Sequence, residues 1–371
     1  MRVLTVFGTR PCAVKMSPLL RKLKECPEID ALCCVTGQHR EMLDAVLEKF
    51  NIKPDIDLNI MTERQTLADI TSRTLVGMVG ALDELKPDLV LVHGDTSTSF
   101  AAALAAFYAK IPVGHVEAGL RTDDRYSPFP EEMNRRMTSR VASLHFCPTS
   151  LNAENLRREG ITDGVYITGN TVIDALNITV SNNYEFESAV GAIIGRPQTA
   201  NTKRLILATV HRRENYNDLE GIFRAFADIL TDCPDTELIL PVHLSPIVRD
   251  AANAALADIP RARLIEPINV WDMHNLMARS TLVLTDSGGL QEEAPALGKP
   301  VLVLRRETER PEAVEAGTVK LVGVERETIV REAKLLLNDK NEYEKMAKAV
   351  NPYGDGKASE RIVEIIRNLE Q

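Results

Sequence analysis

Short apolar runs alternate with helix-like segments along the chain, and this alternation constrains the fold more than any other feature. The first series of runs comprises Val3–Phe7, Ala31–Val35, Leu89–Val92, Val113–Val116 and Leu144–Phe146. None shows the polar–apolar alternation of a strand that has one face in water, so both faces are expected to be buried. Buried strands separated by helices predict a parallel sheet that is covered by helices on both sides.

Apolar residues at helical spacing lie between these runs. The predicted helices are Val14–Cys26, Glu41–Phe50, Leu67–Leu85, Ser99–Tyr108 and Glu131–Val141. A second series of predicted strands comprises Leu205–Val210, Thr236–Leu240, Arg263–Ile265, Leu282–Thr285 and Val301–Leu304. Helices are expected within this series at Leu219–Leu230 and Ile329–Leu337, and an amphipathic helix at Ser359–Leu369. We therefore predict an α/β protein with two doubly wound, Rossmann-like domains.

The length of 371 residues suits two domains rather than one. We place the first at residues 1–175 and the second at residues 176–355, with Asn182–Lys203 as the best linker candidate because it is irregular and contains Gly191, Gly195 and Pro197. Ligands of doubly wound sheets bind outside the carboxyl ends of the strands. The two domains are therefore expected to face a central cleft that holds the site.

Composition excludes several functions. The net charge of −9 argues against a nucleic-acid binder, and no apolar stretch is long enough for a membrane span or a signal peptide. The six cysteines are scattered without zinc-site spacing, so no metal is expected, and buried thiols indicate a cytoplasmic protein. Phe7–Pro11 replaces the Gly-x-Gly-x-x-Gly of a dinucleotide site, which leaves no cofactor expected. Gly354–Ser359 departs from the phosphate-loop pattern and is predicted to be a turn that begins the last helix.

Acidic residues follow two of the predicted strands. Asp95 comes after Leu89–Val92, and Glu117 comes directly after Val113–Val116. The carboxyl ends of parallel strands meet at one edge of a sheet, so these two acids are expected to lie close together. Carboxylates that share a partly dry site repel one another, which raises the pKa of at least one and suits proton transfer near neutral pH. As an alternative, Asp95 can cap the helix that follows it.

Glu131 is a third candidate acid. It begins a helix after Pro130 and is four residues from Arg135, so a capped helix with an ion pair between the two is the structural alternative. Its position beside Asp95 and Glu117 favours a functional role. Cationic Lys15 lies one turn into the first helix, after Arg10.

The second series of strands carries a candidate diphosphate site. Ser287 is expected to cap the helix after Leu282–Thr285, while Gly288 and Gly289 let the backbone approach an anion. Glu293 follows and can accept hydrogen bonds from a ribose. His211 and His243 stand at two other strand ends, with Arg10, Arg212 or Arg213 available to bind an anion. The residues alone thus predict a sugar-nucleotide cleft, and they leave the reaction open.

An ordered set of motifs resembles the non-hydrolysing UDP-N-acetylglucosamine 2-epimerase family. The motifs in the first half are Phe7–Pro11, Gln38–Leu43, His93–Thr96, Gly114–Arg121, Ser127–Glu132 and Gly169–Ala175. Those in the second half are His211–Glu214, Thr285–Gly289 and Thr308–Glu312. The resemblance covers essentially the whole chain, and its order makes it specific.

The resemblance implies a glycosyltransferase B-like architecture in which the helix at about 356–371 packs back on the first domain of a homodimer. It implies reversible C2 epimerisation of UDP-N-acetylglucosamine to UDP-N-acetylmannosamine, through loss and re-addition of UDP across 2-acetamidoglucal, for bacterial-type surface polysaccharide precursors. Residues that match the family's catalytic positions are Asp95, Glu117, Glu131, His211, Lys15 and Arg135. Those that match its UDP contacts are Arg10, His243, Met273, Ser287, Gly288, Gly289 and Glu293.

Some members of the family bind a second, regulatory UDP-N-acetylglucosamine, and Gln38, Arg64 and Gln65 match that allosteric site; an ordinary polar rim is the alternative. The sequence departs from the family pattern at three positions, with Cys12 in place of Glu, Met273 in place of an aromatic residue, and Ser245 in place of Asn. Three other functions remain open: a hydrolysing epimerase, a glycosyltransferase of the same fold, and a non-catalytic nucleotide-sugar sensor.

Overall fold

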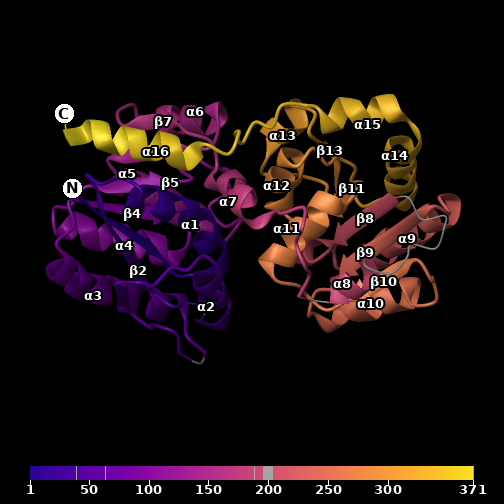
Figure 1. Ribbon diagram of the computed structural model, residues 1–371, viewed down its shortest axis with the longest axis horizontal. Helices are drawn as coiled ribbons and strands as arrows, with labels where there is room; N and C mark the ends of the chain where they lie inside the picture. The colour runs from indigo at the N-terminus through magenta and orange to yellow at the C-terminus, as the bar shows by residue number, and fades with distance from the viewer. Residues whose placement is uncertain (39, 63, 188, 195–203, 371) are drawn as a thin grey trace. The chain divides into compact units, whose positions relative to one another are not determined.

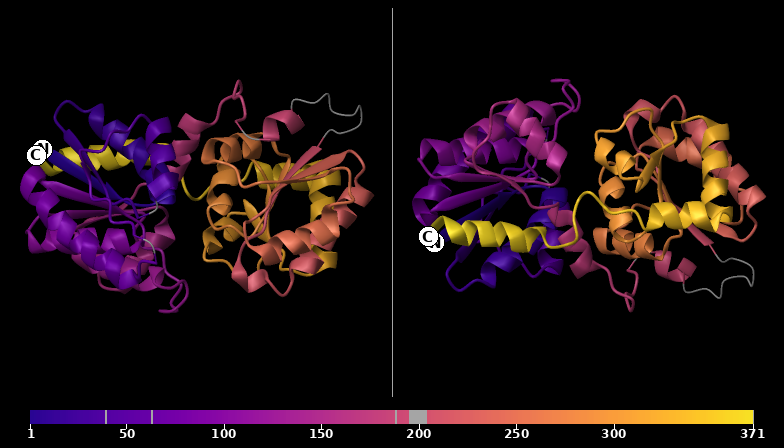
Figure 2. Two further views of the ribbon diagram at one scale, coloured as in Figure 1. Left: turned by 90° about the horizontal axis from the view of Figure 1, so that it is seen from below. Right: turned by 90° about the horizontal axis from the view of Figure 1, so that it is seen from above.

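The computed structural model describes residues 1–38, 40–62, 64–187, 189–194 and 204–370, and it separates into two compact units. Unit 1 contains Met1–Ala175 together with Tyr353–Gln371, and unit 2 contains Leu176–Pro352. Each unit has one parallel sheet with helices on both of its faces (Figures 1 and 2). The predicted α/β class with two doubly wound sheets is confirmed.

Unit 1 has a seven-stranded parallel sheet in the order β3-β2-β1-β4-β5-β6-β7. Its strands are β1 (Arg2–Phe7), β2 (Asp30–Val35), β3 (Ile56–Asp57), β4 (Leu89–His93), β5 (Val113–Val116), β6 (Leu144–Cys147) and β7 (Val165–Ile167). Its helices are α1 (Arg10–Lys24), α2 (Arg40–Lys49), α3 (Leu67–Leu85), α4 (Ser97–Tyr108), α5 (Glu131–Val141), α6 (Ser150–Arg158) and α16 (Ala358–Arg367), while α7 (Thr171–Thr179) runs from unit 1 into unit 2. The strand order reverses between β1 and β4, which creates a crevice at their carboxyl ends.

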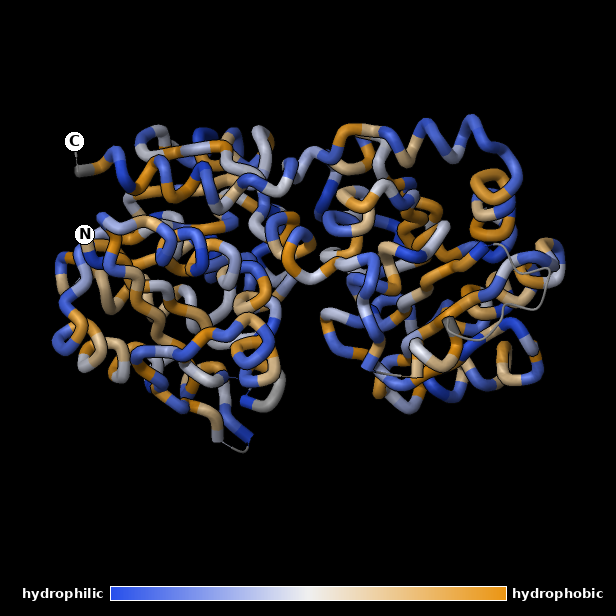
Figure 3. The backbone as a smooth tube through the Cα atoms, viewed as in Figure 1, coloured by the Kyte–Doolittle hydropathy of each residue, from blue (hydrophilic) through white to orange (hydrophobic). Residues whose placement is uncertain are grey.

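Small side chains let the helices of unit 1 lie close to the sheet. α4 buries five alanines, and it packs against α3 through the core that also contains Val90 and Val92 of β4. Central strands appear as apolar segments inside each unit, with hydrophilic residues outside them (Figure 3). The expectation that the predicted strands are buried on both faces is met by β4 and β5, each of which is buried along its whole length.

The carboxyl-terminal helix α16 is part of unit 1. It buries Ile362 and Ile366 and packs against α1. The carboxylate of Asp174 accepts the backbone N–H groups of Ala358 (3.1 Å) and Ser359 (2.8 Å) at the start of this helix. The predicted turn that begins the last helix is confirmed, and a protein carboxylate takes the place that an anion would occupy in a phosphate loop.

Unit 2 has a six-stranded parallel sheet in the order β10-β9-β8-β11-β12-β13. Its strands are β8 (Arg204–Thr209), β9 (Thr236–Pro241), β10 (Ala262–Ile265), β11 (Leu282–Thr285), β12 (Val301–Val303) and β13 (Val319–Leu321). Its helices are α8 (Ala189–Ile194), α9 (Leu219–Asp232), α10 (Pro246–Leu256), α11 (Val270–Arg279), α12 (Leu290–Ala296), α13 (Pro311–Glu315), α14 (Arg326–Asn338) and α15 (Lys340–Ala347). The order reverses between β8 and β11, so this sheet also has a crevice at one switch point.

Short elements account for the differences from the predicted strands. β3, β7 and β13 have two or three residues each and lie at or next to a sheet edge, so they carry no periodic pattern. The predicted linker Asn182–Lys203 lies partly outside the described residues, and α8 falls within it. Within the described ranges, the structure has no helix with the length and hydrophobicity needed to cross a bilayer.

Candidate functional site

Both switch points carry polar side chains. In unit 1, β1 leads to Gly8 and Thr9, and β4 leads to Gly94 and Asp95. A Cβ on Gly8 would lie 1.9 Å from Thr36 Oγ1, so only glycine allows the turn after β1 to approach this closely. The neighbouring strand β5 leads to Glu117, so Asp95 and Glu117 follow adjacent strands at one edge of the sheet.

Glu117 is buried at the end of β5, and its side chain is 8% exposed. The ammonium of Lys15 on α1 forms an ion pair with Glu117 Oε1, and Asn170 Nδ2 donates to the same oxygen at 3.0 Å. Glu117 itself adopts a left-handed backbone conformation with φ of 65°. A non-glycine residue in this conformation is strained, and such strain concentrates at functional sites.

Asp95 lies beside Glu117 and carries a perturbed pKa. The pKa of Asp95 is raised to about 6: burial is the largest cause, Arg135 and Lys15 lower the pKa, and the charges of Glu117 and Glu131 raise it. Arg135 Nη2 lies 3.1 Å from Asp95 Oδ2. The structure thus confirms the expected proximity of the acids and the expected rise in a carboxyl pKa.

Two structural alternatives for these acids are wrong. Asp95 does not cap α4, because the hydroxyl of Thr96 accepts the N–H of Ser99 at 3.1 Å and serves as the cap. Glu131 begins α5, but in the described part of the chain Arg135 pairs with Asp95 and Glu132 rather than with Glu131. The guanidinium of Arg135 therefore faces Asp95 and Glu132. Glu131 is half-buried beside them.

Cys12 lies within the same electrostatic environment. It is buried in the first turn of α1, and burial, together with the charges of Asp95 and Glu117, raises the pKa of its thiol to about 12. The side chain is therefore neutral at physiological pH. Cys12 stands at a position where the resembled family has Glu, so a negative charge that a Glu would place near Lys15 is missing here.

In unit 2, an aspartate at the switch point holds a histidine. His211 follows β8, and its Nδ1 lies 3.0 Å from Oδ1 of the fully buried Asp286, which follows β11. The Asp286 carboxylate also accepts the backbone N–H groups of His211 and Arg212 (both 2.9 Å) and the Nδ2 of Asn215 (3.1 Å). Burial alone would raise the pKa of Asp286, but these hydrogen bonds and the interaction with His211 outweigh it and lower the pKa. The His211 and His243 rings lie 6.1 Å apart, as expected for two strand ends at one edge.

The glycine turn after β11 is packed against an arginine. A Cβ on Gly288 would lie 2.8 Å from Nη1 of Arg310, which is held by Glu292 at 2.6 Å and by Glu309 at 3.0 Å. Ser287 does not cap α12 as predicted. The helix begins at Leu290 with Gly289 in the cap position and no side-chain cap, because the two glycines separate the serine from the first helical turn.

The predicted UDP contacts come from several elements, with Met273 on α11 and Glu293 on α12. Glu293 Oε2 lies 3.5 Å from His274 Nε2, and His274 Nδ1 shares a 2.7 Å hydrogen bond with the Thr179 hydroxyl. Met273 is half-buried on α11 next to His274, and His243 is exposed after β9. Arg10, at the start of α1, has no hydrogen bond or ion pair with any residue that the structure describes.

Two of the three predicted regulatory residues come together. Gln65 Nε2 donates to the backbone oxygen of Gln38 at 3.4 Å, and Gln38 Oε1 accepts from the Thr98 hydroxyl at 2.9 Å. Arg64 is exposed with a φ of 56°, and its side chain makes no contact of this kind in the described ranges. Gln38 and Gln65 are therefore adjacent, and Arg64 does not join them.

Sequence reasoning did not assign roles to several polar residues of these edges. They are His93, Asn170, Asp286, His274 and Arg310. Position was the available signal for His93 and Asp286, because both stand at the carboxyl end of a predicted strand. Asn170 and Arg310 lie in loops after short strands, and no periodic pattern points to them.

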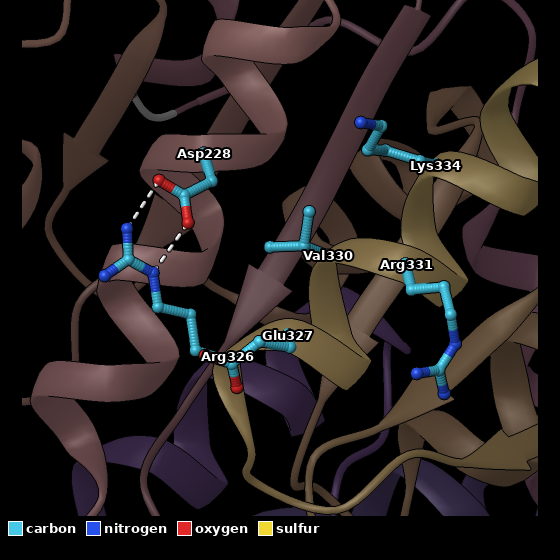
Figure 4. Close-up of a pocket in the computed structure, with 6 residues that line it drawn as sticks. All are labelled: Asp228, Arg326, Glu327, Val330, Arg331 and Lys334. Carbon is cyan, nitrogen blue, oxygen red and sulfur yellow. Dashed lines mark hydrogen bonds and ion pairs between the residues drawn. The ribbon is translucent and has the colours of Figure 1, made fainter.

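A surface hollow of about 540 Å³ lies between α9 and α14 of unit 2 (Figure 4). It is lined by Asp228, Arg326, Glu327, Val330, Arg331 and Lys334. Its cations already have partners: Arg326 pairs with Asp228 and Lys334 with Asp232, each at 2.6 Å, and Arg331 pairs with Glu332 at 3.1 Å. The hollow is a solvated, ion-paired surface and is not part of the candidate site.

The two sheets, each with polar side chains at its switch point, define a doubly wound α/β protein. A profile of the UDP-N-acetylglucosamine 2-epimerase family matches residues 21–367. The chain belongs to this family, whose named members are isomerases.

Known relatives match over nearly the full length. UDP-N-acetylglucosamine 2-epimerase of Bacillus subtilis is 56% identical over 98% of this chain and 94% of its own, and that of Escherichia coli K12 is 53% identical over 99% of both. The crystal structure of the Neisseria meningitidis enzyme bound to UDP-N-acetylglucosamine has a TM-score of 0.88 at 48% identity, covering 99% of this chain and 100% of that one.

A more distant match concerns the fold. The structure of the glycotransferase of kitacinnamycin is 11% identical, with a TM-score of 0.66 over 99% of this chain and 98% of that chain. This likeness agrees with the expected glycosyltransferase B-like architecture.

Proposed function

We propose that this chain interconverts UDP-N-acetylglucosamine and UDP-N-acetylmannosamine by eliminating UDP and adding it back. A carboxylate removes the C2 proton, the C2–H electrons form the C1–C2 double bond of 2-acetamidoglucal, and the C1–oxygen bond breaks with its electrons on UDP. The reverse steps deliver a proton to the opposite face of C2. The overall reaction is redox-neutral and produces precursors for surface polysaccharides.

The acid cluster of unit 1 is the observation that carries this proposal. Elimination and re-addition require a proton acceptor and a proton donor on the two faces of one carbon. Asp95 has a pKa of about 6, so it can exchange a proton near neutral pH. We assign the proton transfers to Asp95, Glu117 and Glu131, and we assign to Lys15 and Arg135 the stabilisation of their charges.

The UDP leaving group is assigned to unit 2. The backbone N–H groups of Gly288 and Gly289 are proposed to bind the diphosphate, together with the cation Arg10. Burial and the charge of His211 lower the pKa of His243, so its imidazole is proposed to contact the diphosphate as a neutral hydrogen-bond donor. We assign to His211, whose ring is held by Asp286, the role of a histidine required for activity. The remaining proposed UDP contacts are Ser287 for phosphate, Met273 for uracil and Glu293 for ribose. The bound ligand named for the Neisseria meningitidis structure supports this assignment.

We also propose that the chain acts as a cytoplasmic homodimer. Exposed apolar side chains gather on two packed helices, Val76 (72%) and Val79 (49%) on α3 and Phe107 (58%) and Tyr108 (64%) on α4. Large apolar side chains that are exposed on neighbouring helices are typical of an interface. Val76→Glu with Phe107→Glu is expected to convert a dimer to a monomer in light scattering, whereas unchanged mass would contradict this interface.

Regulation by a second UDP-N-acetylglucosamine is proposed at Gln38, Arg64 and Gln65. The hydrogen bond between Gln65 and Gln38 supports it, because a preformed polar pair can accept a ligand with little reorganisation. Sigmoidal dependence of rate on UDP-N-acetylglucosamine that becomes hyperbolic in Gln65→Ala would support the site. Identical curves for both proteins would remove it.

Solvent exchange tests the reaction. UDP-N-acetylglucosamine is incubated with enzyme in deuterated water, and we expect deuterium at C2 of both recovered UDP-sugars with little net release of UDP. Asp95→Asn is expected to slow exchange by roughly 10²-fold or more. Asp123→Asn is the matched control, because this exposed carboxylate forms a surface ion pair with Arg136 on α5 at 2.8 Å.

Each contrary outcome identifies a different function. Stoichiometric free N-acetylmannosamine would indicate hydrolysis, and transfer to an added acceptor would indicate a glycosyltransferase. Tight binding of UDP-sugar without any exchange at C2 would indicate a sensor.

A further inference from the structure

His93 is a buried histidine that the assignment of the site has not used. It is the last residue of β4, next to the glycine turn that leads to Asp95, and its side chain is 3% exposed. Neither ring nitrogen has a hydrogen-bond partner in the described part of the structure. A buried imidazole without a partner is costly, so its retention at this position requires an explanation.

The ring of His93 faces the carboxylate of Glu117. Nε2 lies 3.8 Å from Glu117 Oε2, while the other carboxylate oxygen, Oε1, is held by Lys15 and Asn170. A distance of 3.8 Å is too long for a hydrogen bond, yet a bridging water would need the two atoms to be about 5 Å apart. The two atoms therefore lie slightly farther apart than a direct hydrogen bond requires, with no room for a water molecule between them.

The backbone around His93 is fixed. The Ser99 hydroxyl donates to the carbonyl oxygen of His93, and His115 Nε2 lies 2.7 Å from the carbonyl oxygen of Gly94. A Cβ on Gly94 would lie 3.1 Å from Glu117 Oε2, so the turn leaves this oxygen directly above it. The imidazole and the carboxylate are consequently held in register by two neighbouring strands.

We infer that His93 is a positioning residue of the acid site, whose Nε2–H donates to Glu117 Oε2 and fixes the carboxylate when the sugar is bound. Catalytic hydrogen bonds are often long in a free enzyme and shorten in the complex with substrate. The inference rests on the proposed role of Glu117 in proton transfer.

The charge state and tautomer of His93 support this inference. The pKa of His93 is lowered to about 4, because burial and the charge of Lys15 lower it more than the charge of Glu117 raises it, so the ring is neutral at pH 7 and carries one N–H. If that proton is on Nδ1, the lone pair of Nε2 faces the lone pairs of Glu117 Oε2. If it is on Nε2, the N–H points at this carboxylate oxygen and the two groups attract each other. The titratable groups facing this pair are Lys15 and Cys12 on α1, Asp95 after β4 and His115 on β5.

The test compares substitutions that keep or remove a donor at the position of Nε2. The amide of His93→Gln reaches that position, the shorter amide of His93→Asn reaches only that of Nδ1, and His93→Leu has no donor. We expect kcat for C2 deuterium exchange to fall about 10- to 100-fold in the Leu and Asn variants, with KM changed by less than about twofold, and to be largely retained in Gln. In the Leu variant, one limb of the pH–rate profile is expected to move to higher pH, because the ionised carboxylate loses a donor.

His145 provides the matched control. It is also a buried histidine of this sheet, on β6, and burial likewise lowers its pKa to about 4. His145→Gln and His145→Leu are expected to leave the pH–rate profile unmoved. Equal losses in His93→Gln and His93→Leu, wild-type rates in His93→Leu, or a pH–rate profile that stays in place would each overturn the inference. Absence of exchange in the wild-type enzyme would instead overturn the proposed function.

Discussion

Arg135 Nη2 lies 3.1 Å from Asp95 Oδ2 and joins α5 to the end of β4. This cation opposes the rise in the Asp95 pKa, which is otherwise driven by burial and by two neighbouring acids. In Arg135→Gln we therefore expect the macroscopic pKa near 6 in the kcat/KM profile to move upward by about 1 unit, with a 10- to 100-fold lower rate at pH 7. Arg140→Gln, an exposed arginine of the same helix, is the control. If the kcat/KM profile of Arg135→Gln does not move along the pH axis, Arg135 does not control the pKa of Asp95.

Asp95 is also expected to make stability depend on pH. A carboxyl whose pKa is raised by folding destabilises the protein once it ionises, so the penalty is absent below the unfolded pKa and complete above about pH 6. Relative to wild type, Asp95→Asn should gain stability as pH rises from about 4 to 7, by about 1–3 kcal/mol. Urea unfolding at several pH values measures the trend, and a constant difference between the two proteins would contradict it.

Periodic patterns in the sequence predicted the long elements of this fold and the edges that carry the site. α3, α5 and β11 begin and end at the predicted residues. Contacts between side chains from different elements could not be predicted in the same way. The partner of Arg135 is Asp95, forty positions earlier, and the cap of α4 is Thr96 rather than Asp95. These outcomes depend on which donors and acceptors packing brings together, and spacing along the chain does not encode that.

The ion pair between Lys15 and Glu117 is expected to show strong coupling. The two side chains are 14% and 8% exposed, and removal of one partner leaves a buried charge without compensation. Lys15→Met should destabilise unit 1 by about 3–5 kcal/mol and reduce exchange at C2 by about 10²-fold or more. The double variant Lys15→Met with Glu117→Gln should recover much of the stability and none of the activity. Additive losses of stability in the double-mutant cycle would show that the two charges are independently solvated.

Gly288 is expected to control the shape of the UDP edge. A methyl group there would meet Arg310, and this guanidinium cannot easily move because Glu292 and Glu309 hold it. Gly288→Ala should weaken UDP binding about 10-fold or more in calorimetry and lower thermal stability, because the turn must shift away from the held guanidinium. Gly221→Ala on α9 is the control, since a Cβ there meets nothing within 4 Å. Equal UDP affinities for the two variants would argue against close approach of a ligand to this turn.

Asp286 is expected to stabilise unit 2 in a pH-dependent manner. Folding lowers its pKa, so its contribution is present above the unfolded pKa and is lost as pH falls through the folded value. In Asp286→Asn an amide N–H faces donors from His211, Arg212 and Asn215, which should cost about 2–4 kcal/mol at pH 7. The difference from wild type should narrow below about pH 4. Asp218→Asn, an ion-paired carboxyl nearer the surface, should cost less than about 1 kcal/mol. Because the acceptor that orients the His211 ring loses its negative charge, exchange at C2 should also fall in Asp286→Asn. Full activity at pH 7 would show that His211 keeps its position without the charge of Asp286.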